Sequence, residues 1–199
     1  FKAFSPHMGK FLQYAAEQLK AIFYLINEAG GIGHFLPNYE KMLRLGVKGY
    51  LESMEGQGGD LHRAAAIVCE GLLSYANRVA GEVGRLAAAE EGPVRRRELE
   101  DIAAICRRVP LNPAGTFQEA LQSLWLTHMA VCLEGINSAV SFGRMDQFLY
   151  PYYRRDLDEG RITPEKAKEL LLCFSAKAAE HVFLLSESVS QYHGGYLVV

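Results

Sequence analysis

The stretch GGIGHFLPNYEKMLRLGVKG, residues 30–49, joins a glycine-rich loop to the start of an amphipathic helix. Glycine permits backbone conformations that other residues avoid, so the three glycines before His34 allow the main chain to pass close to another group. Pro37 favours a helix start, and apolar residues then recur at helical spacing as far as Gly49. We therefore expect His34 in a loop at the mouth of a helix, where its side chain can face a pocket.

Helical patterns dominate the remainder, which predicts a mostly α fold with a few β-strands in one segment, residues 1–199. Capping residues and first-turn prolines mark most helix starts. Two of the expected helices are Phe11–Ile26 and a long one with Asp60 as its N-cap that runs to about Glu90. Two more are Val94–Arg108, which follows Pro93, and Ala120–Leu133, which follows a Thr116–Glu119 capping box. The last runs from Thr163 and Pro164 to about Glu180. The two strand candidates are Asn137–Phe142 and Tyr196–Val199.

Composition argues against several classes of protein. With 49% apolar residues, the chain has material for one sizeable core. The net charge of −2 gives no electrostatic reason to bind nucleic acid or an anionic membrane, and glutamates flank the basic run Arg95–Arg97. No secretory signal is visible, nor any apolar span of about 18 residues. Four widely spaced cysteines in helical runs fit buried, reduced thiols and a cytoplasmic protein.

Residue spacing gives little support to a nucleotide site or a metal site. Gly31-Ile32-Gly33 begins like a dinucleotide-binding fingerprint, but Leu36 stands where the third glycine belongs and no clear strand precedes the loop. His128 and Cys132 are four residues apart on a helix and could face one ion, yet a zinc site takes at least three protein ligands. We therefore expect no metal site and interpret these two residues as part of a helical core.

Three stretches, in order along the chain, resemble glycyl radical enzymes of the pyruvate formate-lyase-like group, in their N-terminal portion. They are GIGHFLPNYEKMLRLGVKGYLE (residues 31–52), ICRRVPLNPAGTFQEALQSLWLTHMA (105–130) and SFGRMDQFLYPYYRRDLDEGRITPEKAKELL (141–171). The resemblance implies that the segment forms part of an α/β barrel. It also implies a glycyl radical in the whole protein, installed by a radical S-adenosylmethionine activating enzyme. That radical generates a thiyl radical on a cysteine, which abstracts hydrogen from the substrate.

The resemblance also implies substrate-binding residues. In similar dehydratases a histidine at the position of His34 lies in the pocket and hydrogen-bonds a substrate hydroxyl. A serine on the strand over 137–142 contacts a substrate oxygen. Two serines three residues apart cannot both face inward on a regular strand, so Ser141, which is closer to the family position, and Ser138 are alternatives. The commoner sequence pattern in this family has a histidine near the position of Ser138, and this chain differs from it there.

For other polar residues we favour a structural role over a functional one. Arg144 and Asp146 could bind an anionic substrate, but they are more simply explained as a mutual ion pair or as a helix cap. Cys132-Leu133-Glu134 has the Cys-x-Glu spacing of the radical-carrying cysteine, but no glycine precedes it and it comes before the Arg144 block, so we interpret it as a coincidence. Residues 191–193, QYH, are a weak hint of a pocket lining.

We interpret the chain as part of a glycyl radical lyase or dehydratase. The chain contains no glycyl radical motif and no Cys-x-Glu loop preceded by glycine. We therefore expect it to be a segment that is truncated at least at its C-terminus. We also expect it to be inactive alone and to bind no cofactor. The expected partners are a small-molecule substrate, the remainder of the enzyme, the activating enzyme and a second copy in a homodimer. The lack of an anion clamp around His34 favours a neutral, hydroxylated substrate. The alternatives are a non-catalytic helical scaffold protein and a pyruvate formate-lyase-like acyltransferase or decarboxylase.

Overall fold

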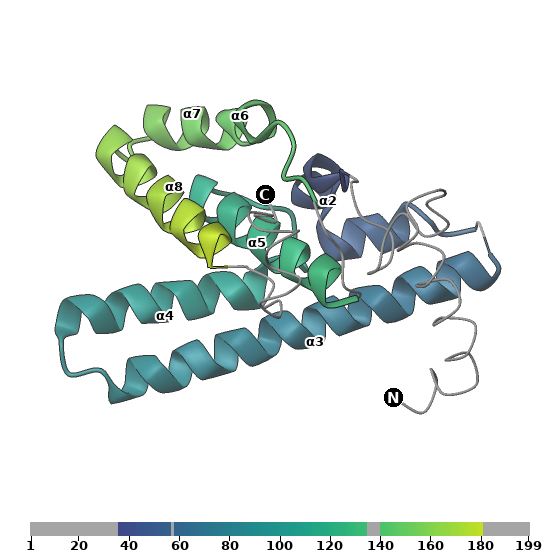
Figure 1. Ribbon diagram of the computed structural model, residues 1–199, viewed down its shortest axis with the longest axis horizontal. Helices are drawn as coiled ribbons and strands as arrows, with labels where there is room; N and C mark the ends of the chain where they lie inside the picture. The colour runs from purple at the N-terminus through teal and green to yellow at the C-terminus, as the bar shows by residue number, and fades with distance from the viewer. Residues whose placement is uncertain (1–35, 57, 135–139, 181–199) are drawn as a thin grey trace, which may run out of the picture.

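A computed structural model describes residues 36–56, 58–134 and 140–180, and this part of the chain is built from helices (Figure 1). Helix α5 contacts α2, α3, α4, α7 and α8 and is therefore the central element. Helices α3 and α4 form a long antiparallel hairpin that extends beyond the other helices (Figure 1). The elements are α2 (Tyr39–Glu52), α3 (Asp60–Ala89), α4 (Pro93–Arg108), α5 (Phe117–Glu134), α6 (Met145–Phe148), α7 (Tyr150–Asp158) and α8 (Pro164–Ala179).

Most helix starts lie within three residues of the sequence prediction, with α5 beginning at Phe117 rather than Ala120 and α2 at Tyr39 rather than Pro37. Helix α8 begins at Pro164, and the Thr163 hydroxyl accepts a hydrogen bond from the Lys166 N–H at 3.2 Å. The prediction that Asp60 is the N-cap of α3 is wrong by one residue, because Gly59 takes that position with φ of 95°. Glycine adopts this backbone conformation without strain, so the turn falls at Gly59 and Asp60 is already helical. The predicted helix Phe11–Ile26 lies outside the described residues.

The start of α5 contains the predicted capping box, but the Glu119 side chain has a different hydrogen-bond partner from the one expected. The Thr116 hydroxyl accepts the Glu119 N–H at 3.2 Å, as a capping box requires. The Glu119 carboxylate, however, accepts the Gly115 N–H at 2.6 Å and also pairs with Arg108 at 3.0 Å. The cap therefore fixes the loop before α5 to the last turn of α4.

Helix α2 is broken at Gly46, where the sequence predicted an uninterrupted amphipathic run. Gly46 has φ of 65° and ψ of 176°, and a methyl group there would lie 2.5 Å from the carbonyl carbon of Asn112. The loop over 110–114 occupies the space beside the break. Val47 donates its N–H to the Pro110 carbonyl at 2.8 Å, and Ala114 donates to the Leu43 carbonyl at 2.9 Å. Gly46 thus allows two backbone segments to pack without an intervening side chain.

Two clusters of buried apolar side chains hold the helices together, and α5 contributes to both. The first joins α2 and α5 to α7 and α8, and the second joins α2 and α5 to α3 and α4. Members of the first cluster include Tyr39, Leu43, Phe117, Leu124 and Phe142, and members of the second include Val47, Leu72, Ala76, Cys106 and Leu126. Apolar residues therefore surround much of α5, as expected for a buried helix.

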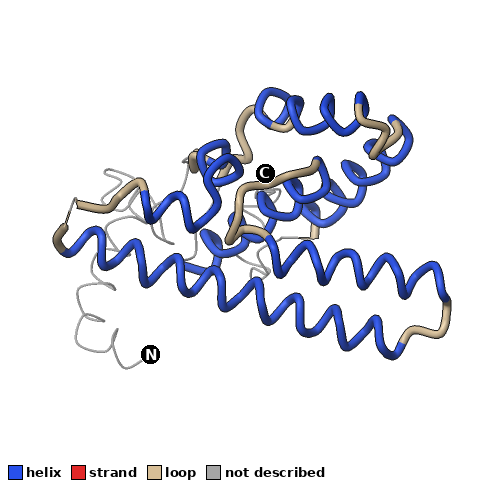
Figure 2. Tube along the Cα trace, turned by 180° about the vertical axis from the view of Figure 1, so that it is seen from behind, coloured by secondary structure: helices blue, strands red, loops and turns tan. Residues whose placement is uncertain are grey.

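The expected β-strands are not seen in the described part of the chain, which contains helices and loops only (Figure 2). Of the candidate Asn137–Phe142, only residues 140–142 are described, and they run in an extended loop with a single bridge position at Val140. A single bridge position is too short to form a strand ladder. The Phe142 ring packs against aromatic side chains of helices, including Phe174 on α8 at 5.0 Å between ring centroids. The other candidate, Tyr196–Val199, lies outside the described residues.

The four cysteines are free thiols in helices, as predicted, but only two of them are buried. Cys69 and Cys106 lie in the second core cluster, whereas Cys132 is half-buried and Cys173 is exposed on α8. Within the described residues, no helix is long and apolar enough to cross a bilayer.

Candidate functional site

One of the three predicted substrate-binding residues is described by the structure. Ser141 is exposed, and its hydroxyl accepts the Gly143 N–H at 3.0 Å. His34 and Ser138 lie outside the described residues, as do residues 191–193. The geometry of a candidate site therefore has to be built from the chain segments that flank these positions.

The two segments that carry the predicted residues meet in the structure. A methyl group at Gly143 would lie 2.5 Å from Cδ1 of Leu36, so the Leu36 side chain covers this glycine. Three residues after Leu36, the Tyr39 ring lies 6.4 Å from the Phe142 ring between centroids. The start of α2 and the extended loop over 140–143 are thus packed against each other, although about a hundred residues separate them in sequence.

A chain of polar side chains lies at this junction. Nδ1 of His128 is 2.7 Å from the Tyr39 hydroxyl, and its Nε2 is 3.6 Å from Sγ of Cys132. Tyr39 and His128 are only 2% and 1% exposed. Burial is the main reason that the pKa of the Tyr39 hydroxyl is raised far above its ordinary value, and proximity to Cys132 adds to it. Burial also raises the pKa of the Cys132 thiol. The tyrosine and the cysteine are therefore neutral at physiological pH.

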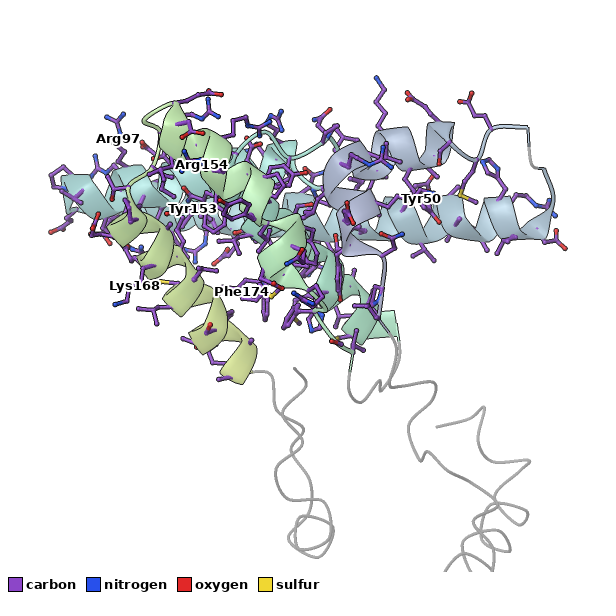
Figure 3. The ribbon with its side chains drawn as sticks, turned by 90° about the horizontal axis from the view of Figure 1, so that it is seen from above. Tyr50, Arg97, Tyr153, Arg154, Lys168 and Phe174 are labelled. Carbon is purple, nitrogen blue, oxygen red and sulfur yellow. The ribbon has the colours of Figure 1, made fainter. Side chains whose placement is uncertain are left out.

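Aromatic rings enclose the imidazole of His128. The Phe142 ring is closest, with 4.1 Å between centroids and an interplanar angle of 33°, and Trp125 lies at 6.1 Å. Phe174 completes the group from α8, in edge-on contact with both Phe142 and Trp125. Figure 3 shows Phe174 on the side of α8 that faces the rest of the molecule, whereas Lys168 points away from it. His128 is therefore a core residue, as predicted from the sequence.

Within the described residues, this polar chain does not extend to a metal site. Among the described residues, no group of three or more histidine, cysteine and acidic side chains is placed to hold an ion. The raised pKa of Cys132, caused by burial, also disfavours the thiolate that a metal or a nucleophilic reaction requires. Cys132 lies in the last turn of α5, in a helix rather than in a loop.

Arg144 and Asp146 form the ion pair that was favoured over an anion-binding role. The guanidinium contacts both carboxylate oxygens, at 2.9 and 2.8 Å, and the Gln147 amide donates to the same carboxylate at 2.9 Å. The Arg144 hydrogen bond, with help from Gln147, holds the pKa of Asp146 far below its usual value. The exposed pair lies directly after Gly143, where it stabilises the turn into α6.

Two further features were not found from the sequence. Helices α2, α6 and α7 border an open cleft of about 620 Å³, in which Glu40, Arg44 and Arg155 surround Tyr152. Asp156 on α7 is 3% exposed, and its carboxylate accepts the Phe117 N–H at 2.7 Å and pairs with Arg161 at 2.7 Å. Both features combine residues that are distant in sequence, so spacing alone could not reveal them. The only local signal in the sequence is that Asp156 lies five positions before Arg161, with which it pairs.

The fold is that of a segment of glycyl radical enzymes. A solved structure from Roseburia inulinivorans, whose subject is 1,2-propanediol dehydration, has a TM-score of 0.77 and 33% identity over 85% of this chain and 22% of its own. A glycyl radical enzyme from Archaeoglobus fulgidus has a TM-score of 0.64 and 39% identity over 71% of this chain and 20% of its own.

The chain belongs to the pyruvate formate lyase-like family, whose pattern matches residues 1–199. An isethionate sulfite-lyase of Oleidesulfovibrio alaskensis is 38% identical over 192 residues, which cover 87% of this chain. The chain spans 23% of the length of that relative. The predicted resemblance to glycyl radical enzymes is thus confirmed.

Proposed function

We propose that this chain is the part of a glycyl radical lyase or dehydratase that supplies helical scaffold and one wall of the substrate chamber. The substrate is a small hydroxylated molecule, and His34 and Ser141, or Ser138 in its place, contact its oxygen atoms. The observation that carries the proposal is the packing of Leu36 over Gly143, because these residues flank the predicted contacts.

Covalent geometry limits how far the predicted residues can lie from this junction. Consecutive Cα atoms are about 3.8 Å apart, so the Cα of His34 lies within about 8 Å of that of Leu36, and Ser138 lies within about 12 Å of Ser141. Histidine and serine side chains can donate to or accept from a hydroxyl or an acid oxygen. This reach allows His34 and one of the two serines to face a common pocket.

The radical chemistry belongs to parts of the enzyme outside this sequence. A glycyl radical, installed by an S-adenosylmethionine-dependent activating enzyme, would supply the radical from which a cysteine thiyl radical forms to abstract hydrogen from the substrate. This chain binds and orients the substrate and keeps water away from it. It is inactive alone. We place the whole enzyme in the cytoplasm, as a homodimer to which its activating enzyme also binds.

Two small molecules serve as probe substrates. The relatives' names point to isethionate, a hydroxyl-bearing sulfonate, and to the neutral 1,2-propanediol. The sequence prediction of a neutral substrate favours the diol, whereas the similarity to isethionate sulfite-lyases favours the sulfonate. Either probe presents a hydroxyl to His34.

The test uses the activated enzyme that contains this sequence, assayed anaerobically with each probe. We expect turnover of one probe, and His34→Ala and one of Ser141→Ala and Ser138→Ala should each raise KM for it by about tenfold, as the loss of one hydrogen bond predicts. Arg63→Ala, at an exposed pair on α3, is the matched control and should leave KM unchanged. A scaffold protein, or an acyltransferase or decarboxylase, would turn over neither probe.

A further inference from the structure

His128 contacts both segments that meet at the candidate site. Through Nδ1 it is hydrogen-bonded to Tyr39, the first residue of α2. Through its ring face it packs against Phe142, at 4.1 Å between centroids. Tyr39 follows Leu36 by three residues, and Phe142 directly follows Ser141. One buried imidazole on the central helix therefore holds the two chain segments in a fixed relation.

We propose that His128 is a positioning residue for the substrate wall, a role that rests on the proposed function. It acts through Tyr39 on the loop that carries His34, and through Phe142 on the segment that carries Ser141. The Nδ1 bond is the specific link, since it joins α5 to the first turn of α2 across 89 positions of sequence. The second bond, from Nε2 to Cys132, lies within α5 and only orients the ring.

The two ring nitrogens can be tested separately. An asparagine side chain places its amide near the position of Nδ1, and a glutamine side chain places its amide near that of Nε2. His128→Asn should therefore retain the bond to Tyr39, whereas His128→Gln should retain the contact with Cys132 and lose Tyr39. Both variants lose the ring that packs against Phe142, and they differ in whether the contact with Tyr39 or the contact with Cys132 is retained.

The kinetic experiment compares these variants in the activated enzyme, with isethionate and 1,2-propanediol as probes. His128→Gln should raise KM about tenfold with kcat within about twofold, because a displaced wall weakens ground-state and transition-state binding equally. His128→Asn should restore most of the wild-type KM. Tyr39→Phe should resemble His128→Gln. Tyr75→Phe, a half-buried tyrosine of the second core cluster, is the matched control and should leave KM unchanged.

Stability and hydrogen exchange separate positioning from a general structural role. The melting temperatures of both variants should fall, since both lose the ring, and that of His128→Gln should fall further because the buried Tyr39 hydroxyl loses its partner. Amide exchange at Tyr39, whose N–H donates to the Pro37 carbonyl at 2.9 Å, should accelerate about tenfold in His128→Gln and remain near wild type in His128→Asn. This measurement needs no turnover, so it tests the positioning even if both probes fail.

Equal KM values and equal exchange rates in the Asn and Gln variants would overturn the positioning role. So would a wild-type KM in Tyr39→Phe. A different pattern tests the site itself: if His34→Ala, Ser138→Ala and Ser141→Ala leave KM unchanged while the exchange rates differ as expected, the proposed substrate wall is wrong and the link between α2 and α5 stands.

Discussion

The α3–α4 hairpin and the junction of α2, α5 and residues 140–143 use glycine in opposite ways. In the hairpin, Gly71 and Gly81 are ordinary helical residues with open space around them. At the junction, Gly46 and Gly143 have φ of 65° and 70° and are covered by backbone or side-chain atoms. The hairpin therefore tolerates glycine, whereas the junction requires it. The difference shows that a helical glycine in open space carries no such requirement, whereas a positive φ and a neighbour in the position of the missing side chain do.

Replacing Gly46 should have the largest effect and tests this contrast directly. Gly46→Ala places a methyl group 2.5 Å from backbone carbon and 2.6 Å from a backbone oxygen, at a positive φ. We expect the free energy of unfolding to fall by about 3 kcal/mol or more. Gly71→Ala, within α3, is the matched control and should raise stability by up to about 1 kcal/mol. Denaturant unfolding measures both, and similar losses in the two variants would contradict the distinction.

The buried carboxylate of Asp156 comes next. Asp156→Ala removes the acceptor of the Phe117 N–H and the partner of Arg161, so we expect a loss of about 2–3 kcal/mol. Asp60→Ala removes an exposed pair with Arg63 in the hairpin and should cost no more than about 0.5 kcal/mol. Urea titration of the two variants gives the comparison. Equal costs would mean that Asp156 contributes no more than a surface charge.

A smaller effect is expected at Gly143, because the atoms that cover it belong to a side chain. Gly143→Ala should cost about 1–2 kcal/mol, from its positive φ and from the contact with Leu36. Leu36→Ala removes the contact but leaves the backbone strain, so the double variant should recover part of the loss. A double-mutant cycle measures this coupling. Strict additivity would show that Leu36 and Gly143 do not interact.

The second core cluster should show a pH dependence that has no effect at neutral pH. Burial raises the pKa of the Cys106 thiol to about 11, from an ordinary value of 9.0. Because the folded-state pKa is the higher one, the contribution to stability is complete below pH 9 and is lost as pH rises from 9 to 11. Cys106→Ala should show a shallower fall in unfolding free energy across this window than the wild type. Parallel pH profiles would contradict the assignment to Cys106.

The sequence predicted regular elements well where local signals act alone. Helix α4 follows from Pro93, and α8 follows from Thr163 and Pro164, because a cap or a first-turn proline acts within one helical turn. The break at Gly46 was missed because its cause is the loop over 110–114, which is distant in sequence. The expected strand over 137–142 followed from β-favouring residues, but its described part has helices as neighbours.

The sequence predicted only part of the candidate site, because contacts between residues that are distant in sequence leave no local pattern. The resemblance identified His34, Ser138 and Ser141, which remain predictions, and core packing of His128 was inferred from the apolar pattern of its helix. No pattern could show that Nδ1 of His128 meets Tyr39, because the two residues are 89 positions apart. The Arg144–Asp146 pair was inferred correctly, since opposite charges two residues apart can meet without tertiary structure.

The length of α5 has a consequence for variation among related chains. Its 18 residues span about 27 Å, at about 1.5 Å per residue, between the Asp156 carboxylate that accepts its first N–H and the thiol of Cys132 near its end. Deleting one residue between Phe117 and His128 would rotate the imidazole by about 100° relative to α7. The helix thus cannot change length by single residues, and insertions or deletions in related chains should fall in the turns on either side of it.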